Sequence, residues 1–449
     1  MNPLLQIPEL QSLQSPSSLV RIPQEIDVPV TNRVMRLVDS AAFRRLARVS
    51  QLGLVATVYP GANHTRFEHS LGVYRNALLY LQRLATIPEF QQQVSVDHAH
   101  LFLVSALLHD VGHFPFCHLI EDMQIPGMQR HEAMASLFLE SDSIAKLLLQ
   151  DWGVQAKDVC ELLSPINKKQ PRYPLLSSLL SGPIDVDKLD YLDRDSLHAG
   201  VPYGRNFDRS RLISQLCLTP DGQSLAITEK GRTAAEMMVF ARYVMFSEVY
   251  WHHTVRAATA MLQRAIWGLL SEEESTVESP MGHFVNEWGK LSEQAFIGRL
   301  RTIARNTPHA DLVEGLFGDH RSIYKCVGEY HCQEAPALHT AIARRPYSDL
   351  QDLAYRLSEK IARETCIEIQ PHELIIDAPP PKLEVQFKIE VRQSSGKFVQ
   401  LGELSPVIQT LTTQQFDNLV KRVRVFVKPE LREQLKNRPI QEYLSAVLN

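Results

Sequence analysis

Residues 107–118 read LLHDVGHFPFCH, and this stretch decides the fold because it ends an apolar helix on two side chains of the metal-ligand type. The preceding residues, 96–108, repeat apolar side chains every three or four positions, which is typical of an α-helix. The glycine and proline that follow stop this helix just after His109 and Asp110. An imidazole and a carboxylate therefore stand side by side at a helix end, where they can bind one ion if other helices supply further ligands.

The histidines are concentrated around this stretch. Of the 17 histidines, eight lie between positions 64 and 131, where an even spread over 449 residues would place about 2.6. Histidine is the commonest metal ligand and also the side chain that carries protons near neutral pH. The concentration therefore predicts metal binding or acid–base chemistry, with carboxylate partners supplied from elsewhere in the chain.

Composition excludes several classes of protein. The chain is 44% apolar and 22% charged, which is ordinary for a globular protein and excludes collagen-like and disordered chains. The sequence contains no apolar run of about 18 residues, so no transmembrane helix is expected. No secretory signal is recognisable either, and a cytoplasmic protein is therefore expected. The net charge of −4 gives no basic excess for nucleic acid or a membrane surface. The six cysteines form no C-x-x-C pair, so free thiols are expected rather than a zinc ribbon.

The apolar pattern divides the chain into three expected regions. Residues 1–34 are rich in Pro, Ser and Gln without clear periodicity, and an extended arm is expected there. Helical spacing dominates residues 35–330, including a pattern of roughly forty residues that starts near position 229 and leaves room for a kink. Residues 331–449 contain alternating apolar positions, so this region is expected to be α+β. The predicted fold class is thus mainly α, with a smaller α+β C-terminal part. Strands are expected at 225–228, 383–391 and 423–427.

Three more segments carry residues suited to metal or phosphate, namely 64–70 (HTRFEHS), 131–132 (HE) and 184–195 (IDVDKLDYLDRD). His69 and a distant aspartate are the natural further ligands for an ion held by the His–Asp pair. Two imidazoles and two carboxylates suit Fe, Mn, Ni or Zn, with positions left open for water or phosphate. Arg66 lies three residues before His69 on the same helical face, where its guanidinium can reach phosphate oxygens.

In this order the segments resemble the HD-domain phosphohydrolases. Within them they resemble the deoxynucleoside triphosphate (dNTP) triphosphohydrolases, which include dGTPase-like enzymes and a branch with a sterile-alpha-motif domain. The resemblance covers about 35–270 and parts of the tail. The stretches that carry it are FRRLARVSQLG (43–53), YPGANHTRFEHSLGVY (59–74), LLHDVGHFPFCH (107–118), IDVDKLDYLDRDSLHAG (184–200), ARYVMFSEVYWH (241–252), LSPVIQTL (404–411) and RVRVFVKPEL (422–431).

The resemblance implies a role for each matching position. The implied metal ligands are His69, His109, Asp110 and Asp187. The implied catalytic residues beside the scissile phosphate are Arg66, His113, His118, Glu121 and His131, with His118 as the acid for the leaving 5′ oxygen. The implied contacts to triphosphate and sugar are Gln51, Leu52, Lys188, Tyr191, Asp195, Arg242 and Tyr250. No role is implied for His64, His98, His100, His252 or His253, which are interpreted as structural.

The implied activity is metal-dependent hydrolysis of dNTPs to a deoxynucleoside and triphosphate. The implied cofactor is a divalent transition metal (Fe, Mn, Ni or Zn) in the HD site, with Mg²⁺ as a candidate companion of the triphosphate. A homo-oligomer is also implied. The activating-nucleotide positions of the sterile-alpha-motif branch read Asp39, Arg44 and Ala47 here, and only the first is kept, so the same nucleotide-activated assembly is not expected. Trp251 replaces a glutamine beside the substrate tyrosine, so base or sugar selectivity is expected to differ.

Two alternatives stay open. The same metal site serves several phosphate esters, so the substrate could instead be a nucleoside monophosphate, a cyclic nucleotide or a nucleic-acid end. The other alternative is a catalytically inactive nucleotide- or nucleic-acid-binding protein, whose signature would be lost metal ligands or a basic stripe. All four candidate ligands are present and the net charge is −4, which argues against that second alternative.

Overall fold

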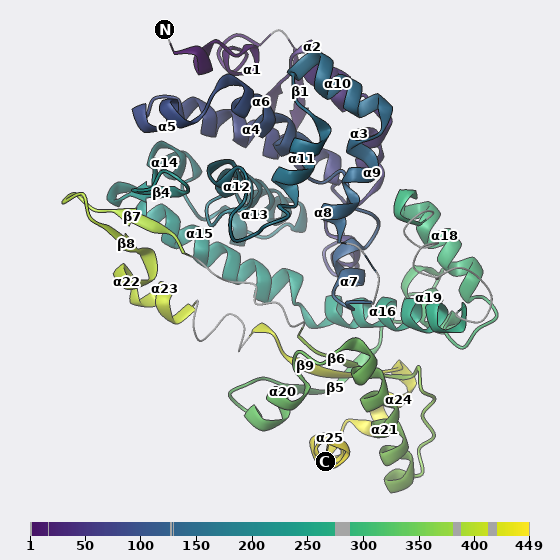
Figure 1. The fold of residues 1–449 in the computed structure, drawn as a ribbon. Coiled ribbons are helices and arrows are strands. Elements are labelled where there is room, and N and C mark those ends of the chain that lie inside the picture. The colour runs from purple at the N-terminus through teal and green to yellow at the C-terminus, as the bar shows by residue number, and fades with distance from the viewer. Residues whose placement is uncertain are drawn as a thin grey trace.

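The computed structural model describes residues 2–16, 18–125, 128, 130–273, 288–379, 388–411 and 420–448. The chain is mainly helical, with small sheets (Figure 1), which confirms the predicted fold class. Across those ranges, no helix is both long and apolar enough to cross a bilayer.

Most helices up to residue 245 surround a first hydrophobic core. The helices of this range are α1 (Pro8–Gln11), α2 (Asn32–Val38), α3 (Ala41–Arg45), α4 (Arg66–Leu84), α5 (Pro88–Gln93), α6 (Val96–Leu108), α7 (Cys117–Glu121), α8 (His131–Met134), α9 (Ser136–Leu139), α10 (Asp142–Trp152), α11 (Ala156–Leu163), α12 (Pro174–Ser181), α13 (Val186–Ala199), α14 (Arg209–Ser214) and α15 (Arg232–Met245). Of these, α7 and α8 instead bury Cys117, Ile120 and Met134 in a second core.

The later helices mostly build this second core. They are α16 (His253–Glu273), α18 (Glu293–Ala304), α19 (Ala310–Phe317), α20 (Pro336–Ile342), α21 (Tyr347–Thr365), α22 (Leu401–Leu404), α23 (Pro406–Thr410), α24 (Pro429–Leu435) and α25 (Ile440–Leu448). Of these, α22 and α23 return to the first core, where Leu401 and Ile408 are buried.

The central helix α4 positions the site. Its Leu71, Tyr74 and Tyr80 are fully buried, and it packs against both α6 and α13. Gly72 lies where α4 meets α13, and a Cβ at that position would be 1.9 Å from Oδ1 of Asp190. The close approach of these helices brings together the three segments that carry the predicted metal ligands.

The loop after α6 is equally tight. The helix ends at Leu108, and His109 caps it, as the glycine and proline in this stretch predict. Gly112 passes so close to α8 that an added Cβ would be 2.1 Å from the carbonyl oxygen of His131. Phe116 adopts a left-handed backbone conformation with φ of 56° and begins α7. This path places the loop histidines beside His131.

The long helical pattern after position 229 is interrupted. A π-helical turn, Phe246–Tyr250, separates α15 from α16. Such turns are rare and often occur at functional sites. Here the turn redirects the chain from the first core to the second (Figure 1).

The three sheets are small. The hairpin β1 (Leu19–Ile22) and β2 (Ile26–Pro29) is antiparallel, and the second sheet has the order β3-β4-β7-β8. The third has the order β5-β9-β6, with β9 antiparallel to both neighbours. The remaining bounds are β3 (Leu216–Leu218), β4 (Leu225–Thr228), β5 (Lys325–Tyr330), β6 (Leu374–Asp377), β7 (Glu390–Arg392), β8 (Phe398–Gln400) and β9 (Val423–Val427).

Two of the three predicted strands are present in full, and the third is described only in part. The strands at 225–228 and 423–427 are confirmed as β4 and β9. Of the pattern at 383–391, the end is strand β7, whereas 383–387 lie outside the described residues.

The extended N-terminal arm is a wrong expectation. Residues Pro3–Gln11 form two short helical segments, and β1 and β2 form a hairpin. Leu4, Ile7 and Leu10 are buried in the first core, which holds this segment against the body of the molecule. The predicted region boundaries at 34 and 330 stay predictions.

Candidate active site

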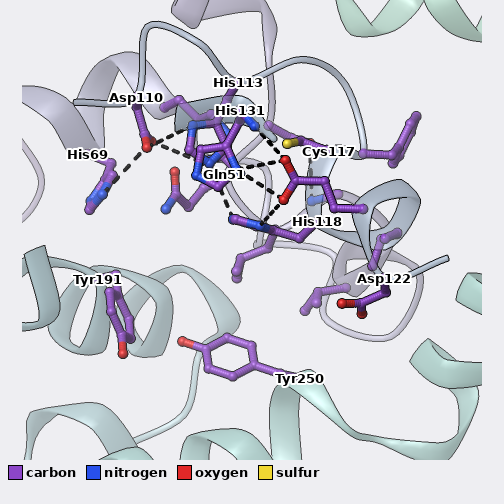
Figure 2. Close-up of a pocket in the computed structure, with 18 of the residues that line it drawn as sticks. Gln51, His69, Asp110, His113, Cys117, His118, Asp122, His131, Tyr191 and Tyr250 are labelled. Atoms are coloured by element: carbon purple, nitrogen blue, oxygen red, sulfur yellow. Dashed lines mark hydrogen bonds and ion pairs between the residues drawn. The ribbon is translucent and has the colours of Figure 1, made fainter. Parts of the chain in front are cut away.

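A cavity of about 860 Å³ lies where α4, α6 and α13 meet the α7 loop and the π-turn. In the view of Figure 2, the histidines occupy one side of it and Tyr191 and Tyr250 the other. Every residue to which the sequence assigns a metal, catalytic or substrate role lines this one cavity. The cavity therefore brings together residues from position 51 to position 250.

Ligand atoms of three predicted metal ligands, His69, His109 and Asp187, lie within 4.8 Å of one another, and Asp110 contacts His109 beside them. Nε2 of His69 is 3.0 Å from Oδ1 of Asp187 and 3.2 Å from Nε2 of His109. Nε2 of His109 is 3.3 Å from Oδ1 of Asp110 and 3.8 Å from Oδ1 of Asp187. Ligands about 2.1 Å from a common cation are separated by roughly 3.0–3.4 Å in octahedral or tetrahedral arrangements. The spacing therefore fits a shared divalent ion.

Outer partners fix the orientation of both imidazoles. Nδ1 of His69 is 2.9 Å from Oδ2 of Asp190, and Nδ1 of His109 is 2.9 Å from the carbonyl oxygen of Ala106. Both Nδ1 atoms are thus engaged as donors, which leaves each Nε2 as the lone-pair nitrogen facing the ion. Asp190 is held in turn by two hydrogen bonds of 2.7 Å donated by the buried Arg194 guanidinium.

The electrostatics of this group also favour a cation. Burial alone would lower the pKa of His69, but Asp187 and Asp190 outweigh it and raise that pKa to about 10. Burial alone would raise the pKa of Asp110, but His113, His109 and Arg66 hold it well below its usual value. Asp110 is therefore ionised, and binding a divalent cation would displace a proton from His69.

A second group of histidines adjoins the first. The rings of His113 and His131 are stacked at a tilt with centroids 3.8 Å apart, and Nε2 of His113 is 3.3 Å from Nε2 of His118. The carboxylate of Glu121 contacts His131 at 2.9 Å from Nδ1. Burial, aided by the nearby charge of Arg66, lowers the pKa of His113 well below 6.5, so this imidazole is neutral. The side chain of His118 is 58% exposed, which leaves it able to meet a ligand.

Arg66 connects the two groups. It is the first residue of α4 and is buried, and its Nη1 donates to Oδ2 of Asp110 at 2.9 Å. Oδ1 of the same aspartate is 3.0 Å from Nδ1 of His113. One carboxylate thus contacts a metal-ligand histidine, the arginine and a loop histidine.

The opposite wall carries the residues predicted to contact substrate. The hydroxyl of Tyr250 donates to Oδ2 of Asp195 at 2.6 Å, and Oδ1 of that aspartate is 2.9 Å from Nε2 of His64. The Lys188 ammonium is paired with Asp185 and also donates to a backbone carbonyl. These contacts hold the side chains of this wall in fixed positions before any ligand enters.

Comparison with known proteins identifies the chain. Residues 66–195 match the model of the HD domain, and residues 207–447 match that of the HD associated region. The chain belongs to the HD-domain phosphohydrolases. It contains the HD associated region as well, and the His–Asp pair at 109–110 lies inside the range that matches the HD domain.

Three relatives illustrate the range of the family. The uncharacterized protein MJ1154 of Methanocaldococcus jannaschii is 28% identical over 94% of this chain and 82% of its own length. The crystal structure of a hypothetical protein from Aquifex aeolicus superposes with a TM-score of 0.68 and 28% identity, covering 93% of this chain and 98% of that one. Human deoxynucleoside triphosphate triphosphohydrolase SAMHD1 is 25% identical over 77% of this chain and 59% of its own length.

Coverage of other relatives is lower. The chain spans about half the length of several curated relatives, including YwfO of Bacillus subtilis at 31% identity. The printed name of the human relative gives a dNTP substrate, whereas those of MJ1154 and YwfO give none. HD domains bind divalent metals, and the His–Asp cluster of this chain matches that property.

Sequence reasoning missed several residues of the HD site. Asp190 was within a quoted motif, and its place three residues after Asp187 on α13 was a usable signal. His64 was interpreted as structural, but it lies against Asp195, 131 positions away, and no local pattern indicates such a contact. Asp185 caps α13 through the Lys188 amide and also pairs with the Lys188 ammonium.

Proposed function

We propose that this HD phosphohydrolase cleaves dNTPs into a deoxynucleoside and triphosphate. The observation that supports it is the composition of one cavity, which joins a cation-binding group, a histidine group and a wall with Lys188, Arg242 and two tyrosines. A relative whose printed name gives this activity matches over 77% of the chain. A dNTP would use all three surfaces at once, with its triphosphate and sugar on the third, whereas a phosphate ester without a nucleoside would use only the first two.

The cation would be held by His69, His109, Asp110 and Asp187. When bound, such an ion polarises a phosphate oxygen and makes a coordinated water more acidic. Arg66, Lys188 and Arg242 neutralise negative charge on the phosphates, as preorganised cations do in phosphoryl-group chemistry.

Proton movement belongs to the histidine group. His118, which is the most exposed of the three, donates a proton to the departing 5′ oxygen. His131 is oriented by Glu121 through Nδ1, and its ring lies beside those of His113 and His118, where it can receive or return a proton. The neutral state of His113 suits it as an acceptor in this group.

The sugar contacts would come from both walls. Tyr250 presents its ring with its hydroxyl fixed on Asp195, and a deoxyribose packs on such a face through apolar contact. Oε1 of Gln51 is buried and, among the described residues, has no hydrogen-bond partner. A sugar hydroxyl that donates to this oxygen would satisfy it, which supports the predicted pairing of Gln51 with the 3′ hydroxyl.

The test is product analysis of the full chain incubated with each dNTP and with Fe²⁺, Mn²⁺, Ni²⁺ or Zn²⁺, in the presence of Mg²⁺. We expect equal amounts of deoxynucleoside and triphosphate, lost at least a hundredfold in His109→Ala because a metal ligand is removed. Release of pyrophosphate or single phosphates without triphosphate would contradict the proposal.

A matched set of lysine and arginine variants separates the alternatives. Lys188→Ala and Arg242→Ala should each reduce triphosphate release at least tenfold. Lys146→Ala, at an exposed position of α10, should not change it. If both cavity variants instead leave hydrolysis of a nucleoside monophosphate or cyclic nucleotide intact, the substrate is the smaller ester. Homo-oligomerisation and a cytoplasmic location are proposed alongside this function.

A further inference from the structure

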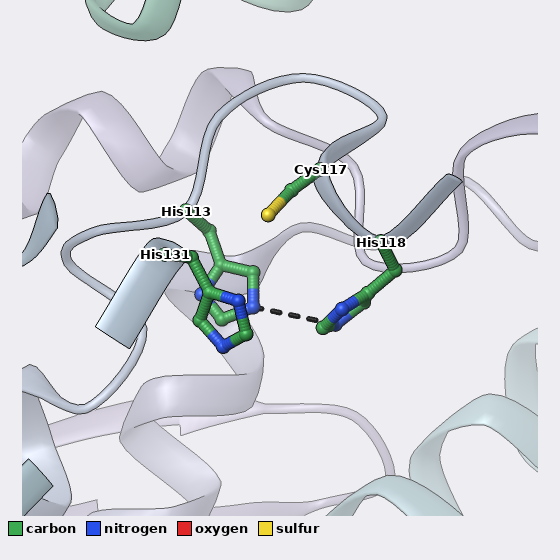
Figure 3. A group of neighbouring side chains, drawn as sticks. All are labelled: His113, Cys117, His118 and His131. Atoms are coloured by element: carbon green, nitrogen blue, oxygen red, sulfur yellow. Dashed lines mark hydrogen bonds between the residues drawn. The ribbon is translucent and has the colours of Figure 1, made fainter. Parts of the chain in front are cut away.

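A second set of ligand-type side chains lies beside the HD ligands and shares none of them. It consists of His113, Cys117, His118 and His131, drawn in Figure 3. One ligand atom from each lies within 4.8 Å of those of the others. The sulfur of Cys117 points toward His113 in that view. We name these four residues the Cys-His₃ cluster.

Carboxylates lie near all three imidazoles of the Cys-His₃ cluster. Nδ1 of His113 is 3.0 Å from Asp110, and Nδ1 of His131 is 2.9 Å from Glu121. Nδ1 of His118 is 3.8 Å from the other oxygen of Glu121. Of these three contacts only that of His131 is a hydrogen bond, and a carboxylate that holds Nδ1 in this way orients an imidazole for metal binding.

The spacing suits a small tetrahedral ion. Zinc binds nitrogen at about 2.0–2.1 Å and thiolate sulfur at about 2.3 Å, which separates tetrahedral ligands by roughly 3.3–3.6 Å. The two Nε2 atoms of His113 and His118 are already 3.3 Å apart. His118 is the most exposed member and lies on a short helix, so it can supply the remaining adjustment.

We propose that the Cys-His₃ cluster is a second metal site of this chain, selective for Zn²⁺ over the harder ions that suit the HD ligands. A thiolate with three imidazoles favours a borderline-soft cation, whereas two carboxylates with two imidazoles accept harder ones. Binding exchanges the thiol proton of Cys117 for a bond between sulfur and zinc. That proton leaves to solvent, and no electron is transferred.

Occupancy of this site has a consequence that rests on the proposed function. The Nε2 lone pairs of the three histidines would be committed to zinc and could not carry a proton. The zinc-loaded cluster is therefore an inactive form of the same cavity, and the HD ligands remain free to hold their own ion.

The test is a Co²⁺ titration of the full chain after metal removal by chelator, since tetrahedral Co²⁺ reports a thiolate ligand by near-ultraviolet charge-transfer absorption. We expect two equivalents bound, with the thiolate band on one of them. The band should persist in Asp187→Asn, which damages the HD ligands, and in Cys160→Ser, a matched cysteine outside the cavity. Zn²⁺ should displace the thiolate-bound Co²⁺.

Two variants of the Cys-His₃ cluster decide the outcome. Cys117→Ser should abolish the thiolate band, and His131→Gln should weaken Co²⁺ binding at this site at least tenfold. A native chain that binds one equivalent without a thiolate band would overturn the proposal, as would a band that is unchanged in Cys117→Ser. The titration contains no nucleotide, so its failure is separate from failure of the proposed function.

Discussion

Asp190 touches no ion in the arrangement described, yet it determines how His69 faces one. Its Oδ2 lies 2.9 Å from Nδ1 of His69, and both oxygens accept hydrogen bonds from Arg194. The aspartate therefore fixes the ring orientation of a metal ligand from behind.

Asp190→Asn should weaken divalent metal binding at the HD ligands by about 10–100-fold, because the amide no longer supplies the negative charge that orients and polarises His69. Metal titration by calorimetry measures this change. The control is Asp193→Asn on the same helix, which loses ion pairs to Arg205 and Arg209 but does not contact a ligand. Equal metal affinity in Asp190→Asn and native protein would refute the role.

At this scale the sequence identified what chemistry each residue can do but not which residues hold the ligands in place. His69 was predicted as a ligand from its residue type and its place in the motif, and Asp187 was predicted from the family resemblance. His64 was not, because its partner Asp195 comes from another helix and only the folded chain brings them together. Long-range side-chain pairs of this kind leave no local pattern.

Among the elements, α4 and α13 cross so closely that the crossing point requires a glycine. Gly72 leaves no room for a methyl group, since a Cβ there would meet both Asp190 and Arg194. The two helices carry His69 and Asp187, so any separation of them also separates the ligands.

Gly72→Ala should destabilise the protein by about 2–3 kcal/mol, because overpacking forces the buried Asp190–Arg194 pair to move. Gly298→Ala is the matched control, since α18 is open at that position and nothing lies within 4 Å of an added Cβ. That variant should gain about 0.5–1 kcal/mol from helix propensity. Chemical denaturation measures both, and equal effects would contradict this packing argument.

Elements were predicted well where the pattern is local. The end of α6 follows from the glycine and proline of its loop, and β9 follows from alternating valines. The extended arm was wrong because the helical segments within residues 3–11 are too short to show a period, yet Leu4, Ile7 and Leu10 reach the first core. The apolar pattern did not predict the π-turn, because this turn changes the spacing of backbone hydrogen bonds without changing the order of apolar residues.

For the whole molecule, a buried ion pair helps attach the N-terminal segment. Glu9 is fully buried and pairs with Arg33, and it also accepts a hydrogen bond of 2.7 Å from the Thr31 hydroxyl. Burial alone would raise the pKa of Glu9, but Arg33 and Thr31 outweigh it and hold that pKa below 4.5.

Because the folded-state pKa of Glu9 is lowered, its contribution to stability is present above pH 4.5 and is lost as pH falls through the folded value. Glu9→Gln should cost about 1–3 kcal/mol at pH 7 and should flatten the decline in stability below pH 4.5. Denaturation curves between pH 7 and pH 3 measure this. A decline identical in native and variant protein would count against it.

The cavity is walled by both hydrophobic cores, with Tyr191 and Tyr250 packed on the first and Leu54 and Phe116 belonging to the second. A molecule bound there is in contact with two separately packed bodies. Its binding free energy then adds to the free energy that holds the two bodies together. A ligand that binds only when both bodies are folded and joined therefore stabilises each of them against unfolding. Resistance to unfolding in the C-terminal half thus becomes a measure of what occupies a site whose metal ligands all lie in the N-terminal half.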